Sequence, residues 1–228
     1  MTTEDGIEVF QKEKYYLLKK NVVIISDEFH LTAQKVKVFF ENGLYDITQL
    51  IADEKVDFIS DEYKISGKGN KVEFDIKNQI VFISGLKSEL FLENTEMTSD
   101  GKINVNNIEG KFKINGPNSK LISENIYING TSIDGNFKII DGKRDISNLV
   151  VEDNEKLNIK TDDILMSAQK AIYNKQESII ELFDKVNITR GNETITGDYG
   201  ILNTAKNSYK VSSKNSNKVK AIILDSND

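Results

Sequence analysis

The sequence predicts an all-β protein built from antiparallel strands. Apolar residues recur at every second position over short runs, as at Val36, Val38 and Phe40, which is the period of a strand with one buried face. Short polar turns separate these runs, and steps such as Asn129-Gly130 accept the positive φ angles of tight hairpins. The hydrophobic fraction of 38% suits thin sheets that are buried on one face. We therefore expect a meander of antiparallel strands.

In chain order, the turns separate runs whose apolar positions alternate. The expected turns are 41–43, 67–70, 99–101, 129–130, 141–142 and 191–193. The alternating positions are Leu31 and Ala33, then Val36, Val38 and Phe40, Val56 and Phe58, Val72 and Phe74, Val81 and Ile83, Ile180 and Leu182, Val186 and Ile188, and Ile195, Tyr199 and Ile201. One stretch, 162–183, also allows a helix, because Ile164, Ala168, Ala171 and Ile172 have helical spacing. The turn-like residues 174–176 favour strands there as well.

The chain is expected to form a single extended domain, 1–228. Pro117 is the one proline, and no proline- or serine-rich linker marks a boundary. Residues 1–10 and 225–228 are expected to be disordered. Residues 91–160 have only a faint strand pattern, which we interpret as possible extra coils of the same fold.

A weak repeat places a small residue three positions before an apolar or small residue, with another apolar residue two positions later. The small residues are Ala33, Gly69, Ala168 and Gly197. Parity changes between the small residue and the next position of the repeat, which indicates a bulge or a sheet corner where a small side chain fits. The alternative is a chance similarity between strand-rich segments. Stacked coils that bury a continuous strip would produce such a repeat.

Composition excludes several classes of function. The formal charge is −6, from 36 acidic and 30 basic residues without a basic stripe, so nucleic acid is not an expected partner. Cysteine is absent and His30 is the single histidine, so neither a zinc site nor a thiol or Ser-His-Asp nucleophile is expected. Acidic pairs such as Asp162-Asp163 fall at turns and are expected to be solvated. We predict a protein that is not an enzyme and uses no metal or cofactor.

No run approaches the roughly 18 apolar residues of a membrane span. The start, residues 1–5, lacks the basic and apolar regions of a signal peptide. The chain is therefore expected to be either cytosolic or a mature segment whose signal peptide or anchor has been removed.

Three successive segments resemble the repeat of the OstA-like family, of which LptA is a member. They are Leu165-Met-Ser-Ala-Gln-Lys-Ala-Ile-Tyr173, Ile179-Ile-Glu-Leu-Phe-Asp-Lys-Val-Asn-Ile-Thr-Arg-Gly191 and Thr194-Ile-Thr-Gly-Asp-Tyr-Gly-Ile-Leu202. Residues 16–24, 47–58, 65–85 and 219–223 are similar to other parts of the family pattern, so the likeness covers about 16–90 and 163–224.

This resemblance implies an elongated, twisted β-jellyroll of two facing antiparallel sheets that is open at its ends. It also implies a periplasmic protein that carries the acyl chains of lipopolysaccharide (lipid A) in an apolar groove from the inner to the outer membrane. Its implied partners are an inner-membrane LptC-like and an outer-membrane LptD-like jellyroll domain. The chain could be either the bridge protein or the anchored inner-membrane relative. The alternative function is a structural, adhesin-like β-solenoid without lipid cargo.

The alternating inward positions are the expected groove residues, with ordinary sandwich core as their alternative. Edge strands near 15–25 and 218–224 could add strands of another copy and form a head-to-tail homo-oligomer, unless both are capped and the protein is monomeric. The expected groove residues are Leu31, Val36, Val38, Phe40, Val56, Phe58, Val72, Phe74, Ile83, Leu182, Val186, Ile188, Ile195, Tyr199 and Ile201.

Overall fold

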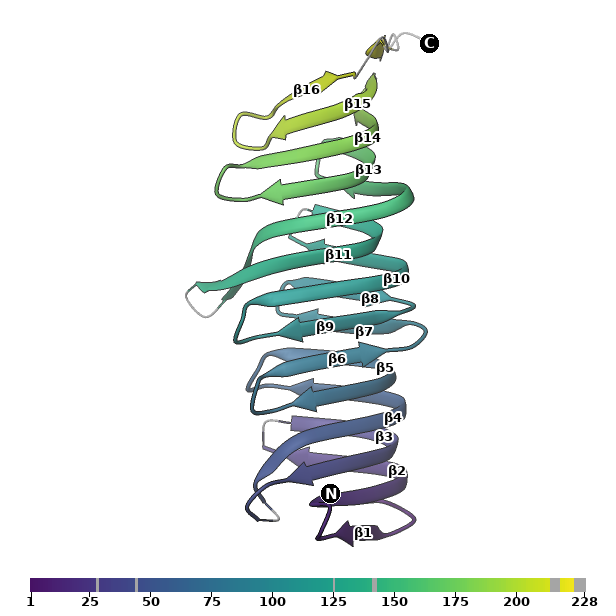
Figure 1. Cartoon of the computed structure of the whole chain (residues 1–228), viewed down its shortest axis with the longest axis vertical. Coiled ribbons are helices and arrows are strands. Elements are labelled where there is room, and N and C mark those ends of the chain that lie inside the picture. Colours follow the sequence, from purple (N-terminus) through teal and green to yellow (C-terminus); the bar gives the residue numbers. More distant parts are fainter. Residues whose placement is uncertain (28, 44, 125, 141–142, 214–217, 224–228) are drawn as a thin grey trace. The chain divides into compact units, whose positions relative to one another are not determined.

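The computed structural model describes residues 1–27, 29–43, 45–124, 126–140, 143–213 and 218–223. Seventeen strands and no helix lie in these ranges, and every ordered strand pairing given by residue is antiparallel, so the all-β prediction is confirmed (Figure 1). None of the described residues forms a helix that could cross a bilayer. The strands are β1 (Ile7–Phe10), β2 (Tyr15–Ser26), β3 (Phe29–Phe40), β4 (Ile47–Ser60), β5 (Ile65–Asp75), β6 (Ile80–Ser84), β7 (Ser88–Leu92), β8 (Thr95–Ser99), β9 (Lys102–Asn106), β10 (Lys111–Ser123), β11 (Ile126–Ile140), β12 (Lys143–Lys160), β13 (Ile164–Asn174), β14 (Ile179–Arg190), β15 (Glu193–Asn203), β16 (Ser208–Ser212) and β17 (Lys220–Ile223).

The chain divides into two compact units, Met1–Gly116 and Pro117–Asp228. β10 begins in the first unit and ends in the second. Each unit is described by itself below, and the expectation of one domain over 1–228 remains a prediction.

In the first unit, the long strands β2 to β5 form successive hairpins, and a break in register divides each of β2, β3 and β4 into two halves. The breaks fall at Lys19/Val22 in β2, Thr32/Lys35 in β3 and Asp53/Val56 in β4. At the corners of β2 and β4, two consecutive residues have positive φ: Lys20 and Asn21 in β2, and Glu54 at 66° and Lys55 at 54° in β4. Two consecutive left-handed residues turn a strand sharply, so the two halves of β2 and of β4 belong to different faces, and β3 follows them through its pairing with both.

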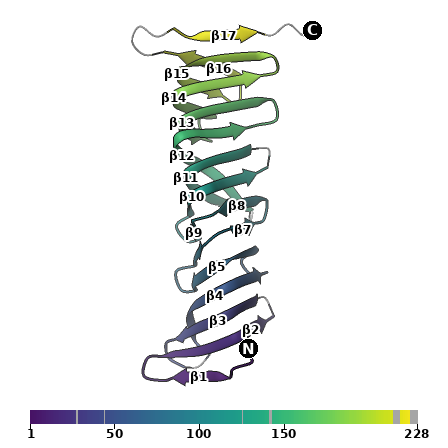
Figure 2. The same ribbon diagram turned by 90° about the vertical axis from the view of Figure 1, so that its right-hand side faces the viewer.

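These half-strands build two layers, which we call leaf A and leaf B. Figure 1 shows the strands of the unit bending at the right-hand side, and Figure 2 shows β2 to β5 stacked in sequence order. In the first unit, leaf A contains β1, residues 15–19, 35–40, 47–53 and 71–75, β6 and β9; leaf B contains residues 22–26, 29–32, 56–60 and 65–69, β7 and β8.

The second unit repeats the same plan. Register breaks at Asn129/Ser132, Glu152/Leu157, Ser167/Lys170 and Phe183/Val186 separate the two halves of each long strand. Its leaf A contains residues 132–140, 143–152, 170–174, 179–183 and 199–203 with β16, and its leaf B contains residues 126–129, 157–160, 164–168, 186–190 and 193–197 with β17. The helical alternative for 162–183 is wrong, because β13 and β14 pair through this stretch.

The small residues of the repeat lie at these corners, as the sequence predicts. A Cβ added at Gly69 would lie 2.6 Å from Ile83 Cγ2, and one added at Gly197 would lie 2.6 Å from Val211 Cγ1. Ala33 and Ala168 are buried beside register breaks of their own strands. A larger side chain would push the neighbouring strand away at each of these positions.

Residues 91–160, for which extra coils are expected, lie in β7 to β12 and follow the same two-leaf plan in each unit. In the first unit, two short strands, β6 and β7, take the place of one long bent strand beside β5. β5 pairs with β6 through residues 71–75 and with β7 through residues 65–68, and Gly85 with φ 116° lies between β6 and β7.

The N-terminal residues correct one expectation. Residues 1–10 are not outside the fold, because Ile7 to Phe10 pair with β2 and Thr2 forms a bridge with Val23. Ile7 lies opposite the buried Leu18, so its side chain continues the apolar face of leaf A. β1 therefore takes the edge position expected for 15–25. Residues 225–228 and Leu224 lie outside the described residues.

Candidate lipid-binding groove

Most of the expected groove residues face the space between the two leaves and are buried. Along each half-strand, every second residue is buried and its neighbours are partly or fully exposed, as the period of a strand requires. The buried members of the expected set are Leu31, Val36, Val38, Phe40, Val56, Phe58, Val72, Phe74, Ile83, Leu182, Val186 and Ile188.

In the first unit, aromatic rings join the leaves. Phe58 of leaf B meets Phe74 of leaf A edge to face, with 4.7 Å between ring centroids, and Phe29 meets the same ring at 5.5 Å. A Cβ placed on Gly67 would lie 3.0 Å from the Phe58 ring, so glycine is what allows the ring to lie against β5. The strip between the leaves is thus closely packed here.

In the second unit, the two leaves enclose a small cavity with an apolar lining. Its free volume is about 10 Å³, which is room for about one water molecule. Side chains of both leaves contribute: Leu149, Val151, Ala171, Tyr173 and Ile180 from leaf A, and Ile126, Ile128 and Ile159 from leaf B. Any occupant larger than water has to separate these side chains.

Sequence reasoning missed most of this lining, because it lies in the faintly patterned stretch. The local signal is present: Ile126 and Ile128, Leu149 and Val151, and Leu157 and Ile159 each alternate. The irregularity between Glu152 and Leu157 separates two of these pairs in β12, which hides the longer repeat.

The inward positions expected for Tyr199 and Ile201 are wrong. Gly200 and Leu202 are the buried residues of this half of β15, so Tyr199 and Ile201 face outward. Between the pairs Val186–Gly197 and Phe183–Tyr199 the register shifts, so the inward-facing positions of β15 change from odd to even residue numbers after Gly197. Alternation counted from Ile195 does not include this shift. Ile195 itself lies opposite the buried Ile188, faces inward and is half-buried.

On the outer face, Tyr199 makes a specific polar contact. Its hydroxyl donates to Glu181 Oε1, and its ring lies 5.3 Å from that of Phe183. The hydrogen bond to the Glu181 carboxylate, followed by burial, raises the pKa of Tyr199 to about 12. Tyr199 therefore belongs to the outer surface and does not line the interior.

Polar groups between the leaves are satisfied by the chain itself. Ser88 Oγ donates to the Gly85 carbonyl at 2.8 Å, and Ser99 Oγ donates to the Asn115 carbonyl at 2.9 Å. Among the described residues, no buried side-chain nitrogen or oxygen lacks a hydrogen-bond partner. At the cavity, burial raises the pKa of Tyr173, so its phenol is neutral at physiological pH. The interior therefore offers contact surface and few specific polar bonds.

The ionisable residues do not gather into a catalytic or metal-binding group. Within the described ranges, no cluster of three or more His, Cys, Asp or Glu side chains could hold a metal ion. Asp163, from the acidic pair at the β12–β13 turn, lies 2.7 Å from Arg190 in an exposed ion pair. His30 lies between the inward-facing Phe29 and Leu31 positions and opposite the exposed Ile25.

Comparison with known proteins adds a family to this geometry. One similar solved structure is that of LptH, described as the LptA homologous periplasmic component of the conserved lipopolysaccharide transport device from Pseudomonas aeruginosa. The two sequences are 10% identical, the match covers 72% of this chain and 97% of the LptH chain, and the TM-score is 0.32. No curated protein matches the chain. The sequence profile described as "LptA/(LptD N-terminal domain) LPS transport protein" matches residues 5–111 and 93–208. Because these matches span most of the chain and the strands have the two-leaf arrangement expected from the OstA-like repeat, this protein belongs to the LptA/LptD N-terminal domain family of lipopolysaccharide transport proteins.

Proposed function

We propose that this protein is a periplasmic carrier that binds the acyl chains of lipopolysaccharide between its leaves and passes them from the inner towards the outer membrane. The observation that carries the proposal is the apolar strip between the leaves of each unit, which is lined from both sides and contains a small cavity in the second unit. LptC-like and LptD-like jellyroll domains are the partners that a bridge would contact. Strand β1 of the first unit and strands β16 and β17 of the second unit, which have mostly exposed residues, are candidate contacts for those partners or for a further copy of the chain.

Burial of acyl chains can supply the affinity without polar recognition. Each methylene transferred from water to an apolar environment contributes roughly 0.8 kcal/mol. The free volume in the second unit, about 10 Å³, is far smaller than an acyl chain, so binding requires the leaves to move apart. The separation of the leaves offsets part of this transfer free energy. Because the leaves are joined covalently at the strand corners, they can move apart while the strand ladders within each leaf stay intact.

The close packing of the interior also favours a second candidate function, a structural β-solenoid without cargo. In that case the strip between the leaves is an ordinary core. Phe58, 1% exposed and packed against Phe74, is the residue that fits this alternative best.

Photo-crosslinking in cells separates the two functions. A photoreactive amino acid at Tyr173, which lines the cavity and is half-buried, is expected to crosslink to lipopolysaccharide. The matched control is Ile172, the preceding residue of β13, which is half-buried on the opposite face. A second pair, Phe74 against Glu73, tests the first unit. Equal labelling from inward and outward positions, or none at either, would refute the carrier function.

A further inference from the structure

The outer face of leaf A in the second unit carries a row of apolar side chains. Val150 of β12 lies opposite Ile172 of β13, and Ile172 and Ile201 lie on either side of Glu181 of β14. All four side chains are half-buried. The described strands of the second unit all belong to one leaf or the other, so none of them covers this face. The row therefore offers contact area to a second molecule.

Glu181 lies in the middle of this row with its charge not neutralised by the protein. Its Oε1 accepts the hydrogen bond of Tyr199, and among the described residues no lysine or arginine forms an ion pair with it. Lys170, which lies opposite Phe183 in the adjacent row, pairs with Glu152 at 2.7 Å. A carboxylate has about four acceptor sites, and one phenol uses a single site. The carboxylate therefore favours a cation supplied by a partner.

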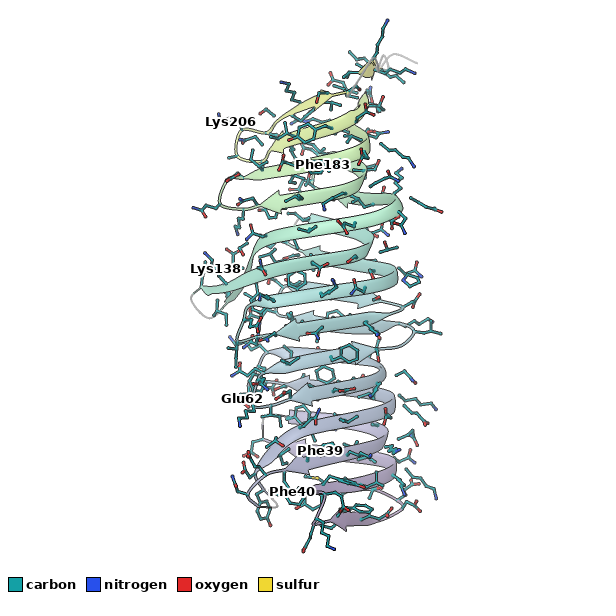
Figure 3. All side chains as sticks on the ribbon, in the orientation of Figure 1. Phe39, Phe40, Glu62, Lys138, Phe183 and Lys206 are labelled. Carbon is teal, nitrogen blue, oxygen red and sulfur yellow. The ribbon has the colours of Figure 1, made fainter. Side chains whose placement is uncertain are left out.

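Two aromatic rings adjoin this carboxylate. Phe183 lies opposite Tyr199, with 5.3 Å between ring centroids and an angle of 61° between the rings. Figure 3 labels Phe183 among the strands β13 to β15. A guanidinium group binds carboxylates through two parallel N–H groups, stacks on aromatic rings and is more weakly hydrated than an ammonium group. An arginine side chain therefore fits these surroundings better than a lysine side chain does.

The spacing of the row indicates which kind of segment can carry this arginine. Neighbouring strands are about 4.8 Å apart, so Ile172 and Ile201 are separated by roughly 9.6 Å with Glu181 midway between them. Residues i and i+7 of an α-helix are about 10.5 Å apart along its axis and share a face with residues i+3 and i+4. Residues i and i+4 of a strand are about 13 Å apart. A helix that crosses the strands along the row therefore matches its spacing, and a strand does not.

We propose that the outer face of leaf A in the second unit binds an amphipathic helix of a partner protein through an arginine in the middle of its apolar face. The arginine pairs with Glu181, and apolar side chains one helical turn before and after it pack on Ile172 and Ile201. Ile180 and Leu182, the neighbours of Glu181 in β14, are buried between the leaves. Helix docking and cargo binding therefore use opposite sides of leaf A and are independent of each other.

Fluorescence anisotropy of the full chain with a labelled synthetic helix tests the proposal. The probe is a peptide of about 20 residues, mainly alanine and glutamine, with leucine at positions i and i+7 and arginine at i+4. A second peptide has glutamine in place of the arginine, and the unchanged protein is expected to bind it at least about tenfold more weakly. Glu181→Gln, which keeps an acceptor for Tyr199, is expected to remove this difference. The double variant Ile172→Ser/Ile201→Ser is expected to bind both peptides at least about tenfold more weakly.

Glu62→Gln is the matched control. Glu62 is an exposed glutamate beside Tyr63 at the β4–β5 turn of the first unit (Figure 3), and this variant is expected to bind both peptides as the unchanged protein does. Circular dichroism melts confirm that each variant is folded. Because the described chain contains no helix, a helical difference spectrum reports the bound peptide.

Three results would overturn the proposal: absence of saturable binding, equal binding of the two peptides by the unchanged protein, or equal losses for Glu181→Gln and Glu62→Gln. A β-type difference spectrum would also overturn it, because the peptide would then have joined an edge strand. Absence of lipopolysaccharide crosslinking at Tyr173 with intact peptide binding would contradict the carrier function alone.

Discussion

Replacement of Phe58 by alanine is expected to destabilise the first unit strongly. Phe58 is 1% exposed, and its ring meets Phe74 of the opposite leaf at 4.7 Å. Backbone and side chains surround the ring, since a Cβ on Gly67 would already lie 3.0 Å from two of its atoms. The site cannot collapse easily, so the loss should lie towards the upper end of the range of about 3–5 kcal/mol for Phe→Ala in a core.

The matched control is Phe91→Ala in the same leaf. Phe91 is 39% exposed and lies on the outer face of β7 beside Ser66 of β5. Its replacement should cost less than about 1 kcal/mol. Urea unfolding followed by circular dichroism measures both values. A loss below about 2 kcal/mol for Phe58→Ala, or similar losses for the two variants, would show that the leaves are not held together by this aromatic contact.

Two further predictions concern the corner and the outer face. Gly101→Ala should lower the free energy of unfolding in urea by about 3 kcal/mol, because the added Cβ would lie 2.2 Å from the Asn115 carbonyl oxygen and backbone cannot give way as a side chain can. The control Gly43→Ala, whose Cβ would meet nothing within 4 Å, should lower it by less than about 0.5 kcal/mol. Equal losses for the two variants would contradict the close approach at Gly101. The pKa of Tyr199 is raised from 10.0 to about 12, so its hydrogen bond contributes stability below pH 10 that is lost as the pH rises towards 12. Tyr199→Phe should therefore show a smaller loss of stability between pH 10 and 12 than the unchanged protein, and identical pH profiles would exclude this role.

The sequence predicts the strands and their inward faces well where one run stays regular. Val36, Val38 and Phe40 alternate without interruption in β3, and all three are buried. The small residues Ala33 and Gly69 also indicate the corners correctly, because a bend that brings strands together has no room for a large side chain.

Prediction fails where the register changes. Alternation continued from Ile195 predicts that Tyr199 and Ile201 face inward, but the break after Gly197 moves every later side chain of β15 to the other face. Where a strand bulges depends on its partner, and no local pattern in β15 reports the two left-handed residues Asp184 and Lys185 of β14.

The sequence by itself determined the all-β class, the hairpin succession and the family, because hydrophobic period and turn chemistry are local properties. Only the tertiary structure decided which side chains line the cavity of the second unit, that residues 7–10 join the sheet, and that Ile139 and Ile140 lie beyond the ladder with β13. These features depend on where one strand ends relative to its neighbour. That relation is set by pairing between distant segments, which the period of a single strand does not contain.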